Sequence, residues 1–410
     1  MRKMFRLLLL RGVLTLAILL MPAVLRSQTA TLQWGDTLRA SLDSLLENPM
    51  FLRSQVAILV YDLDGDSVVY DHGSRQLMRP ASVMKVLTAT TALNELGADY
   101  PFRTTLAYNG FIEPDTMLSD SLHEWKVLRG DIYIKGGFDP LFGEEDMRAF
   151  TESLREQGIR RIDGRVFADL SFKDTLKWGE GWCWDDKEAT LTPLLYKAKD
   201  MFMPRFLQAL DGDSVVRPTG YARITDGRAT DLTVLCERTH TVEQMLTHMM
   251  KESDNLYAES LFYQLSAARQ RATARLSAER EYALMRQLGL NPDAYTVADG
   301  SGLSLYNYLT PHLVVRLLRY VWSRPDILAI LYPSLPVAGI DGTLKKRMKG
   351  TQAEGNVHAK TGTLRKVSTL AGYATAGNGK HLAFCIFNQG ILNSQEGRDF
   401  QDVVCQELVK

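Results

Sequence analysis

The sequence predicts an α+β protein in which an antiparallel sheet, flanked by helices, is interrupted by an inserted α+β domain. Runs of β-forming residues gather near both ends of the chain, at 55–70 and 356–388, and helical patterns fill 241–322. Between them, the texture changes to short strand-like runs. Because strands from both chain ends can pair in a single sheet, we expect a main domain of residues 28–98 and 237–410 and an inserted domain of residues 99–236.

Residues 1–27 are expected to be a signal peptide and not part of the fold. Arg2 and Lys3 give a basic start, and the uninterrupted apolar run from Gly12 to Leu25 is too short to span a bilayer with ease. Cleavage near Gln28 would deliver a secreted protein. An uncleaved amino-terminal anchor is the alternative, and peripheral association with the membrane stays open.

Composition excludes some classes of partner. Lys plus Arg and Asp plus Glu number 48 each, so no general field attracts nucleic acid or an anionic membrane. No close pair of cysteines suggests a metal site, and we expect neither a metal nor a cofactor. Free buried thiols are favoured over disulfides, because Cys385 lies in an apolar run and Cys405 in an expected closing helix. The other two cysteines are Cys183 and Cys236.

The elements before the insertion are a helix, a hairpin and a second helix. The first helix is expected at 36–46, and strands at 55–61 and 67–70 surround the turn Asp64-Gly65. Pro80 suits the start of the second helix, which runs toward Gly97. In the insertion we expect one amphipathic helix, 144–157, and strands at 125–128, 131–135 and 166–169.

After the insertion, Thr241 and Gln244 form a capping box that opens a helix. Further helical patterns and three strands follow. The expected helices are 260–288, 311–322 and 395–408, and the expected strands are 356–360, 368–374 and 382–388.

Ser82-Val83-Met84-Lys85 is the stretch on which the functional interpretation depends. In the first turn of a helix, Lys85 projects from the same face as Ser82, so its amine can reach the serine hydroxyl. A lysine activates a serine only if its proton is removed by burial or by a nearby cation. Alone, this pair is weak evidence for catalysis, because both residue types are common and a surface pair on a helix is the simpler interpretation.

Two further motifs supply what the pair lacks. Ser253-Asp254-Asn255 follows the capped helix, and Lys360-Thr361-Gly362-Thr363 is expected to end a strand. Ser-x-x-Lys, Ser-x-Asn and Lys-Thr-Gly, in this order, mark the penicillin-binding proteins and the related serine β-lactamases. Each motif has a structural interpretation, such as a helix cap or a charge on a strand edge, but the three together favour catalysis.

The chemistry explains these residue types. Lys360 would be the second cation, helping to keep Lys85 neutral and attracting a substrate carboxylate, while Ser253 relays a proton from Lys85 to the departing amine. Asn255 can hold a substrate amide and steady Lys85. Gly362 would let a ligand lie close to the strand edge.

With these groups, the expected reaction intermediate is an ester on Ser82. The backbone amides of Ser82 and Thr363 would form the oxyanion hole. Thr361, Gly362 and Thr363 would bind the substrate. The result is acyl transfer through a covalent intermediate.

From about residue 35 to the end, the chain resembles the D-alanyl-D-alanine carboxypeptidase/endopeptidases of the class C low-molecular-mass penicillin-binding proteins, the penicillin-binding protein 4 type. The resemblance extends beyond the three motifs. The large insertion is its signature, although residues 86–252, 167 positions, are short for the family and suggest that an inserted subdomain is reduced. The other matching stretches are 130–140, 181–186, 298–304 and 335–344.

The resemblance implies a penicilloyl serine transferase fold, a periplasmic enzyme, and cleavage of the terminal D-Ala-D-Ala bond or the D-Ala to diaminopimelate cross-link of peptidoglycan. The implied partners are peptidoglycan stem peptides and β-lactam antibiotics as covalent inhibitors. Asp169 resembles the inserted-domain aspartate that binds the amine end of a diaminopimelate side chain, and an ordinary aspartate at a strand end is the alternative.

Two positions depart from the pattern. Some relatives carry an arginine after Gly302-Leu303-Ser304, where this chain has Leu305, and a glutamine where it has Arg365. We hypothesise that Arg365 replaces the missing positive charge in substrate binding.

Two alternative functions remain at this point. A serine β-lactamase would need a group that activates water, for which the sequence offers no clear candidate, and the long insertion also argues against it. A catalytically silent envelope-binding protein on the same fold is disfavoured because all expected site residues are present.

Overall fold

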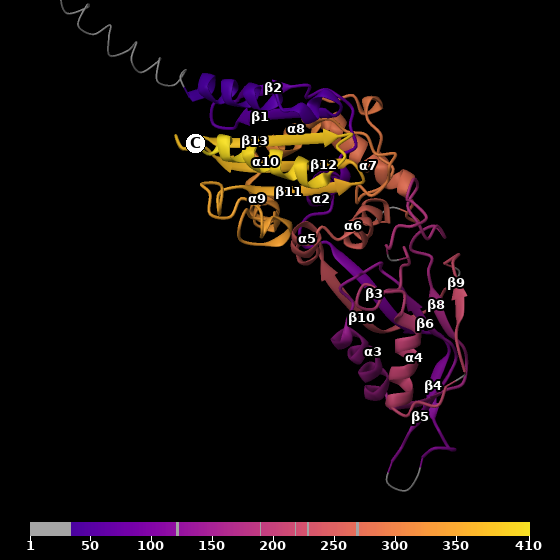
Figure 1. Ribbon diagram of the computed structural model, residues 1–410. Helices are drawn as coiled ribbons and strands as arrows, with labels where there is room; N and C mark the ends of the chain where they lie inside the picture. The colour runs from indigo at the N-terminus through magenta and orange to yellow at the C-terminus, as the bar shows by residue number, and fades with distance from the viewer. Residues whose placement is uncertain (1–33, 120–122, 189, 218, 228, 268–269) are drawn as a thin grey trace, which may run out of the picture.

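The computed structural model describes residues 34–119, 123–188, 190–217, 219–227, 229–267 and 270–410. The expected signal peptide lies outside these residues. The molecule is elongated, with a helix-flanked sheet at one end and the smaller inserted sheets at the other (Figure 1).

The main sheet joins the two ends of the chain, as expected. Its strand order is β11-β12-β13-β1-β2, and every neighbouring pair is antiparallel. The first two strands precede the insertion and the last three follow it. Their bounds are β1 Gln55–Asp62, β2 Ser67–His72, β11 His358–Leu364, β12 Val367–Thr375 and β13 His381–Gln389.

Alternation along the strands divides the main domain into two cores. In β1, Ala57, Leu59 and Tyr61 face the larger helical core, whereas the intervening Val56, Ile58 and Val60 face a second core with the carboxyl-terminal helix. Because successive side chains of a strand point to opposite faces, one buried strand serves both cores. The apolar runs in the sequence therefore reflect burial on both faces.

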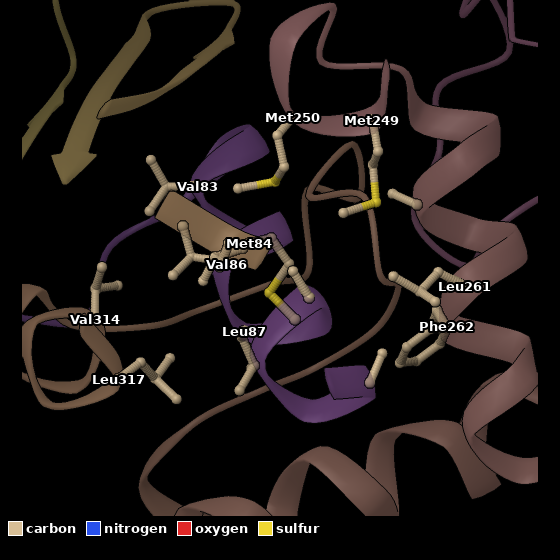
Figure 2. Packing of buried hydrophobic residues seen from close by; sticks show 14 of the residues in the cluster. Val83, Met84, Val86, Leu87, Met249, Met250, Leu261, Phe262, Val314 and Leu317 are labelled. Atoms are coloured by element: carbon tan, nitrogen blue, oxygen red, sulfur yellow. The ribbon is translucent and has the colours of Figure 1, made fainter. Parts of the chain in front are cut away.

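Helix α2 (Met84–Glu95) lies inside the larger core and not on its surface. All its residues from Met84 to Leu93 are buried. Figure 2 shows its first turns between side chains of α5, α6 and α8, with Met249, Leu261 and Val314 among them. A helix held on all sides gives the residues at its start little freedom to move.

Helices cover both faces of the main sheet, and residues 34–46 are helical as expected. The predicted helix over 260–288 is wrong in one respect, because it is two helices: α6 ends at Ala267, and α7 begins at Ala274 after the capping residue Thr273. The remaining bounds are η1 Pro49–Leu52, α5 Val242–Lys251, α6 Asn255–Ala267, α7 Ala274–Gln287, η3 Pro292–Ala294, α8 Pro311–Trp322, α9 Pro325–Ser334, η4 Gly342–Leu344 and α10 Ser394–Leu408.

The insertion forms two mixed sheets around its own apolar core, with strand orders β10-β3-β6-β8-β9 and β4-β5-β7. The boundary expected after residue 236 falls inside β10, which pairs with β3 as far as Thr241. The bounds are β3 Pro101–Tyr108, β4 Phe111–Pro114, β5 Lys126–Arg129, β6 Ile132–Lys135, α3 Glu144–Glu156, β7 Ile159–Ile162, β8 Val166–Asp169, α4 Phe202–Gly212, β9 Ala222–Ile224 and β10 Thr233–Thr241.

The cysteines are free, as favoured from the sequence, but they are not all buried. Cys385 and Cys405 are buried, Cys236 is half-buried and Cys183 is exposed. Within the residues that the structure describes, no helix combines the length and apolarity needed to cross a membrane.

Candidate active site

Ser82 lies at the junction between the main sheet and the buried helix. It occupies the short 3₁₀ turn η2 (Ala81–Val83), directly before α2, so the expectation that it lies within the first α-helical turn is wrong by one element. Lys85 is the second residue of α2. The predicted contact is nevertheless present, with Lys85 Nζ 3.1 Å from Ser82 Oγ. Ser82 is partly exposed, as a nucleophile must be.

The turn before Ser82 has a local cause. Ala81 has a positive φ of 46°, which is uncommon for a residue with a side chain. Gly302 packs directly on this turn, and a Cβ on it would lie 1.8 Å from the Ala81 carbonyl oxygen. The glycine therefore lets the 299–304 loop approach the backbone next to the nucleophile.

Lys85 is fully buried and has three polar contacts. Besides Ser82, its amine donates to Asn255 Oδ1 at 2.7 Å and to the Ser301 carbonyl at 2.7 Å. Burial lowers the pKa of Lys85 to about 8, against the opposing effect of nearby carboxylates, chiefly Asp299. Desolvation, more than a second cation, therefore makes this lysine a usable base near neutral pH.

Ser253 and Asn255 lie where α5 gives way to α6. Ser253 has a φ of 62°, so the chain turns sharply between the two helices and presents both side chains. Ser253 Oγ accepts a hydrogen bond of 2.8 Å from Lys360 Nζ. Among the described contacts, none joins Ser253 to Lys85, so the expected relay between these two residues stays a prediction.

Lys360 lies on β11, beside the α5–α6 junction. It is fully buried, and its amine also donates to the carbonyl of Thr361 at 2.8 Å. Burial and the neighbouring charge of Lys85 hold the pKa of Lys360 well below its usual range. The motif Lys360-Thr361-Gly362-Thr363 lies toward the end of its strand as expected, but the strand itself is His358–Leu364 and not 356–360.

Gly362 is also needed for a reason that was not expected. A Cβ at this position would lie 2.2 Å from Thr369 Oγ1 and 2.9 Å from both the Pro80 carbonyl oxygen and the Ser82 amide nitrogen. Thr369 Oγ1 in turn donates to that Pro80 carbonyl at 2.7 Å. The glycine therefore admits the chain's own nucleophile turn against β11, in addition to any ligand.

The edge of β11 carries the other expected substrate-binding groups. Thr363 is exposed, and Thr361 Oγ1 donates to Thr343 Oγ1 at 2.7 Å. Thr343 belongs to the segment 335–344, whose Pro336 carbonyl also accepts from the amide of Ala359. This segment, one of the stretches that resemble the family, thus flanks the strand from His358 to Thr361.

The 299–304 loop is organised by Asp299, which sequence reasoning did not select. Its buried carboxylate accepts hydrogen bonds from the Gly302 amide at 2.8 Å and the Ser304 amide at 2.7 Å. It also accepts from the Trp182 indole Nε1 at 2.8 Å. A charged hydrogen bond therefore joins two stretches that resemble the family separately in the sequence, 181–186 and 298–304.

Glu259 holds the same loop from the side of α6. Its buried Oε1 accepts from the amides of Gly300 at 3.1 Å and Ser301 at 2.9 Å, and Ser301 is the residue whose carbonyl binds Lys85. Burial raises the pKa of Glu259 to about 8. A charged residue inside a mostly apolar stretch of sequence, 256–265, was the signal that could have identified it.

The insertion also reaches the catalytic groups themselves. Glu188 Oε1 accepts a hydrogen bond of 2.8 Å from Asn255 Nδ2. Nothing in the sequence near Glu188 distinguishes it from other charged residues of a polar segment. Sequence reasoning missed it for that reason.

Two expected substrate-binding residues are not joined to this group. Asp169 ends β8 in the insertion, and its carboxylate accepts from the Ser171 amide at 2.9 Å. Arg365 is exposed in the turn between β11 and β12. The guanidinium that contacts Leu305 is that of Arg79, whose Nε donates to the Leu305 carbonyl at 2.9 Å.

Metal-ligating side chains gather at one place among the described residues. Cys183, Asp185 and Asp186 offer ligand atoms within 4.8 Å of one another, and Cys183 and Asp185 are exposed. Asp186 Oδ2 accepts a 2.6 Å hydrogen bond from the Cys183 amide, as in an ordinary turn.

The D-Ala-D-Ala carboxypeptidase 3 (S13) family matches residues 38–199 and 202–408, almost the whole chain. A D-alanyl-D-alanine carboxypeptidase from Actinomadura sp. is 27% identical, over 86% of this chain and 81% of that protein. The D-alanyl-D-alanine carboxypeptidase DacB of Haemophilus influenzae is 24% identical, over 82% of this chain and 86% of that protein.

Solved structures share the fold. Penicillin binding protein 4 from Haemophilus influenzae matches 89% of this chain and 97% of its own with a TM-score of 0.76 at 21% identity. A predatory peptidoglycan endopeptidase from Bdellovibrio bacteriovorus matches 86% of this chain and 91% of its own with a TM-score of 0.56 at 18% identity. The match over nearly the full length, together with the three motifs, places this chain in the D-Ala-D-Ala carboxypeptidase 3 (S13) family, as a serine-type DD-peptidase.

Proposed function

We propose that this enzyme hydrolyses D-Ala-D-Ala or D-Ala-diaminopimelate bonds of peptidoglycan stem peptides through an acyl-enzyme on Ser82. The observation that carries the proposal is the buried Lys85 amine 3.1 Å from Ser82 Oγ, with a pKa lowered to about 8. A neutral lysine at that distance can take the serine proton as the oxygen attacks the substrate carbonyl.

The remaining motif residues would complete the reaction. The amides of Ser82 and Thr363 stabilise the oxyanion of the tetrahedral intermediate. Ser253 gives its proton to the departing amine and regains one from the lysine pair, in which Lys360 Nζ lies 2.8 Å from Ser253 Oγ. Water then hydrolyses the ester, which releases the shortened peptide and restores Ser82.

Substrate recognition is proposed to involve both domains. Asn255, Thr361, Gly362 and Thr363 would hold the peptide beside β11. Asp169 and Arg365 would contribute to recognition of the side chain or carboxylate of the stem peptide. The insertion is proposed to extend over 101–241, from the start of β3 to the end of β10, in place of the boundaries 99–236.

The proposed place of action is outside the cytoplasm, and more specifically the periplasm after removal of residues 1–27. The S13 family of D-Ala-D-Ala carboxypeptidases, to which the chain belongs, supports the extracytoplasmic part of this proposal. Peripheral association with the membrane is a further expectation, which fractionation of cells with and without high salt would test.

The test is covalent labelling of the full chain with a fluorescent penicillin. We expect a stable adduct on the wild-type protein and none on Ser82→Ala. No adduct on the wild type contradicts the proposal and leaves a catalytically silent binding protein, whereas an adduct that is hydrolysed within seconds favours the β-lactamase alternative. Incubation with a monomeric pentapeptide and with a cross-linked dimer then separates carboxypeptidase from endopeptidase action.

A further inference from the structure

The inserted segment 179–188 is held tightly against the catalytic domain. The Leu305 amide donates to the Gly181 carbonyl at 3.2 Å, and the Trp182 indole donates to buried Asp299 at 2.8 Å. A Cβ on Gly181 would lie 2.6 Å from Ser304 Oγ, so the backbone of this glycine packs directly against the Ser304 side chain. This anchoring brings Glu188, farther along the same segment, to Asn255.

The contact of Glu188 decides which way the side-chain amide of Asn255 points. Asn255 donates through Nδ2 to Glu188 Oε1 at 2.8 Å and accepts through Oδ1 from Lys85 Nζ at 2.7 Å. A carboxylate accepts hydrogen bonds and does not donate them, so it selects the amide orientation with nitrogen toward Glu188 and oxygen toward Lys85. The reversed amide would direct its NH₂ group at the lysine.

We propose that Glu188 is a positioning residue for acylation: it fixes the orientation of Asn255, and thereby that of Lys85, so that the insertion completes the catalytic site. This inference rests on the proposed function. The second N–H of the Asn255 amide stays available for a substrate carbonyl, because an amide nitrogen carries two donors. Glu188 therefore supports substrate binding and does not compete with it.

The charge of Glu188 gives a second readout. It is one of the carboxylates that favour the protonated form of Lys85. Lys360, the other buried amine of the site, is itself held toward its neutral form by burial and by the charge of Lys85. The carboxylates are those of Asp299, Glu259, Asp254 and Glu188. Removing one negative charge lowers the pKa of Lys85, so the neutral base persists to lower pH.

The experiment compares Glu188→Leu, Glu188→Gln and wild type in acylation by fluorescent penicillin between pH 5 and pH 9. The leucine variant has no acceptor, and we expect its maximal acylation rate to fall by about tenfold or more, with less change in the half-saturating penicillin concentration. The glutamine variant keeps an acceptor. Its maximal rate should stay within about threefold of wild type, while its acid limb moves to lower pH.

Glu180→Leu is the matched control, because it makes the same change at an exposed position of the same segment and should acylate like wild type. Thermal unfolding of all variants checks that they are folded. Wild-type rates in Glu188→Leu, or equal losses in the leucine and glutamine variants, contradict the inference. So does a loss confined to hydrolysis of the adduct, since Glu188 would then act on water. A wild type that is not acylated overturns the proposed function instead.

Discussion

At the scale of single residues, the site depends on two buried lysines whose surroundings differ. Lys85 is bonded to Ser82, Asn255 and a backbone carbonyl, whereas Lys360 is bonded to Ser253 and its own strand. Burying an ammonium group disfavours its charged form, so both lysines are kept closer to neutrality than lysines in water. Burial of the two lysine amines therefore lowers the stability of the fold, and their role is in catalysis.

The pKa of Lys85 predicts the pH dependence of acylation. Only the neutral amine can accept the serine proton, so the second-order rate constant should rise with pH and level off above about 8. Below that pH it should fall about tenfold per unit. Acylation by fluorescent penicillin between pH 5 and pH 9 measures it, and a flat profile over this range would exclude Lys85 as the base.

A variant that cannot lose its proton provides the comparison. Lys85→Arg keeps a positive charge at all these pH values. We expect its acylation rate at pH 8 to be lower than that of wild type by about 100-fold or more. The difference in acylation rate between wild type and Lys85→Arg should become smaller toward pH 5, because the wild-type lysine is also protonated there.

At the scale of elements, the nucleophile turn is held between β11 and the 299–304 loop by two glycines. Gly362 admits the turn on one side and Gly302 admits the loop on the other. Gly362 and Gly302 are far apart in the sequence, and the strand and the loop that carry them meet only through η2, which lies between them. Both glycines serve backbone contacts that no side chain can replace.

Gly362→Ala should therefore move Ser82 away from its partners. The added Cβ has nowhere to go without shifting Thr369 or the backbone at Pro80 and Ser82. We expect a loss of about 1–3 kcal/mol in stability and a much larger relative loss of acylation. Gly212→Ala is the control, because a Cβ there meets nothing within 4 Å. Chemical denaturation and penicillin labelling measure the two effects; unchanged labelling of Gly362→Ala would contradict this account.

The elements show which features the sequence could predict. The main sheet, its helices and the meeting of Ser82, Lys85, Asn255 and Lys360 followed from periodicity and from short motifs, because each of those signals is local or chemically distinctive. The 3₁₀ turn at Ala81 was not predicted, since Gly302, more than 200 positions away in the chain, packs against it.

The missed residues have the same origin. Asp299 and Trp182 stand in stretches matched in the sequence, yet nothing in either stretch indicates that one binds the other. Glu188 has no local signal, because its importance arises only from where the fold places it. Periodicity identifies elements and motifs identify chemistry, whereas neither specifies contacts between distant segments.

At the scale of the whole molecule, the insertion and the catalytic domain are joined at the active site. Ser260 and Gln264 of α6 donate to the backbone carbonyls of Phe138 and Gly137 in the insertion. The 179–188 segment makes the contacts at Asp299 and Asn255. Loss of a hydrogen bond between the insertion and the catalytic domain should therefore slow catalysis as well as reduce stability.

Trp182→Phe tests this coupling, because it keeps the aromatic bulk but removes the hydrogen bond to Asp299. That bond joins a neutral donor to a buried carboxylate, so its loss should cost about 1.5–3 kcal/mol. We expect slower acylation, since Asp299 holds the loop that binds Lys85, and faster tryptic cleavage at Lys187 as the segment loosens. The matched control is Trp184→Phe, whose side chain is 96% exposed and should change neither property. A Trp182→Phe variant that loses stability but acylates at the wild-type rate would contradict this coupling. The insertion would then be attached to the catalytic domain without holding the active site in shape. In that case the loop around Asp299 would keep its conformation through its own hydrogen bonds, without the one from Trp182.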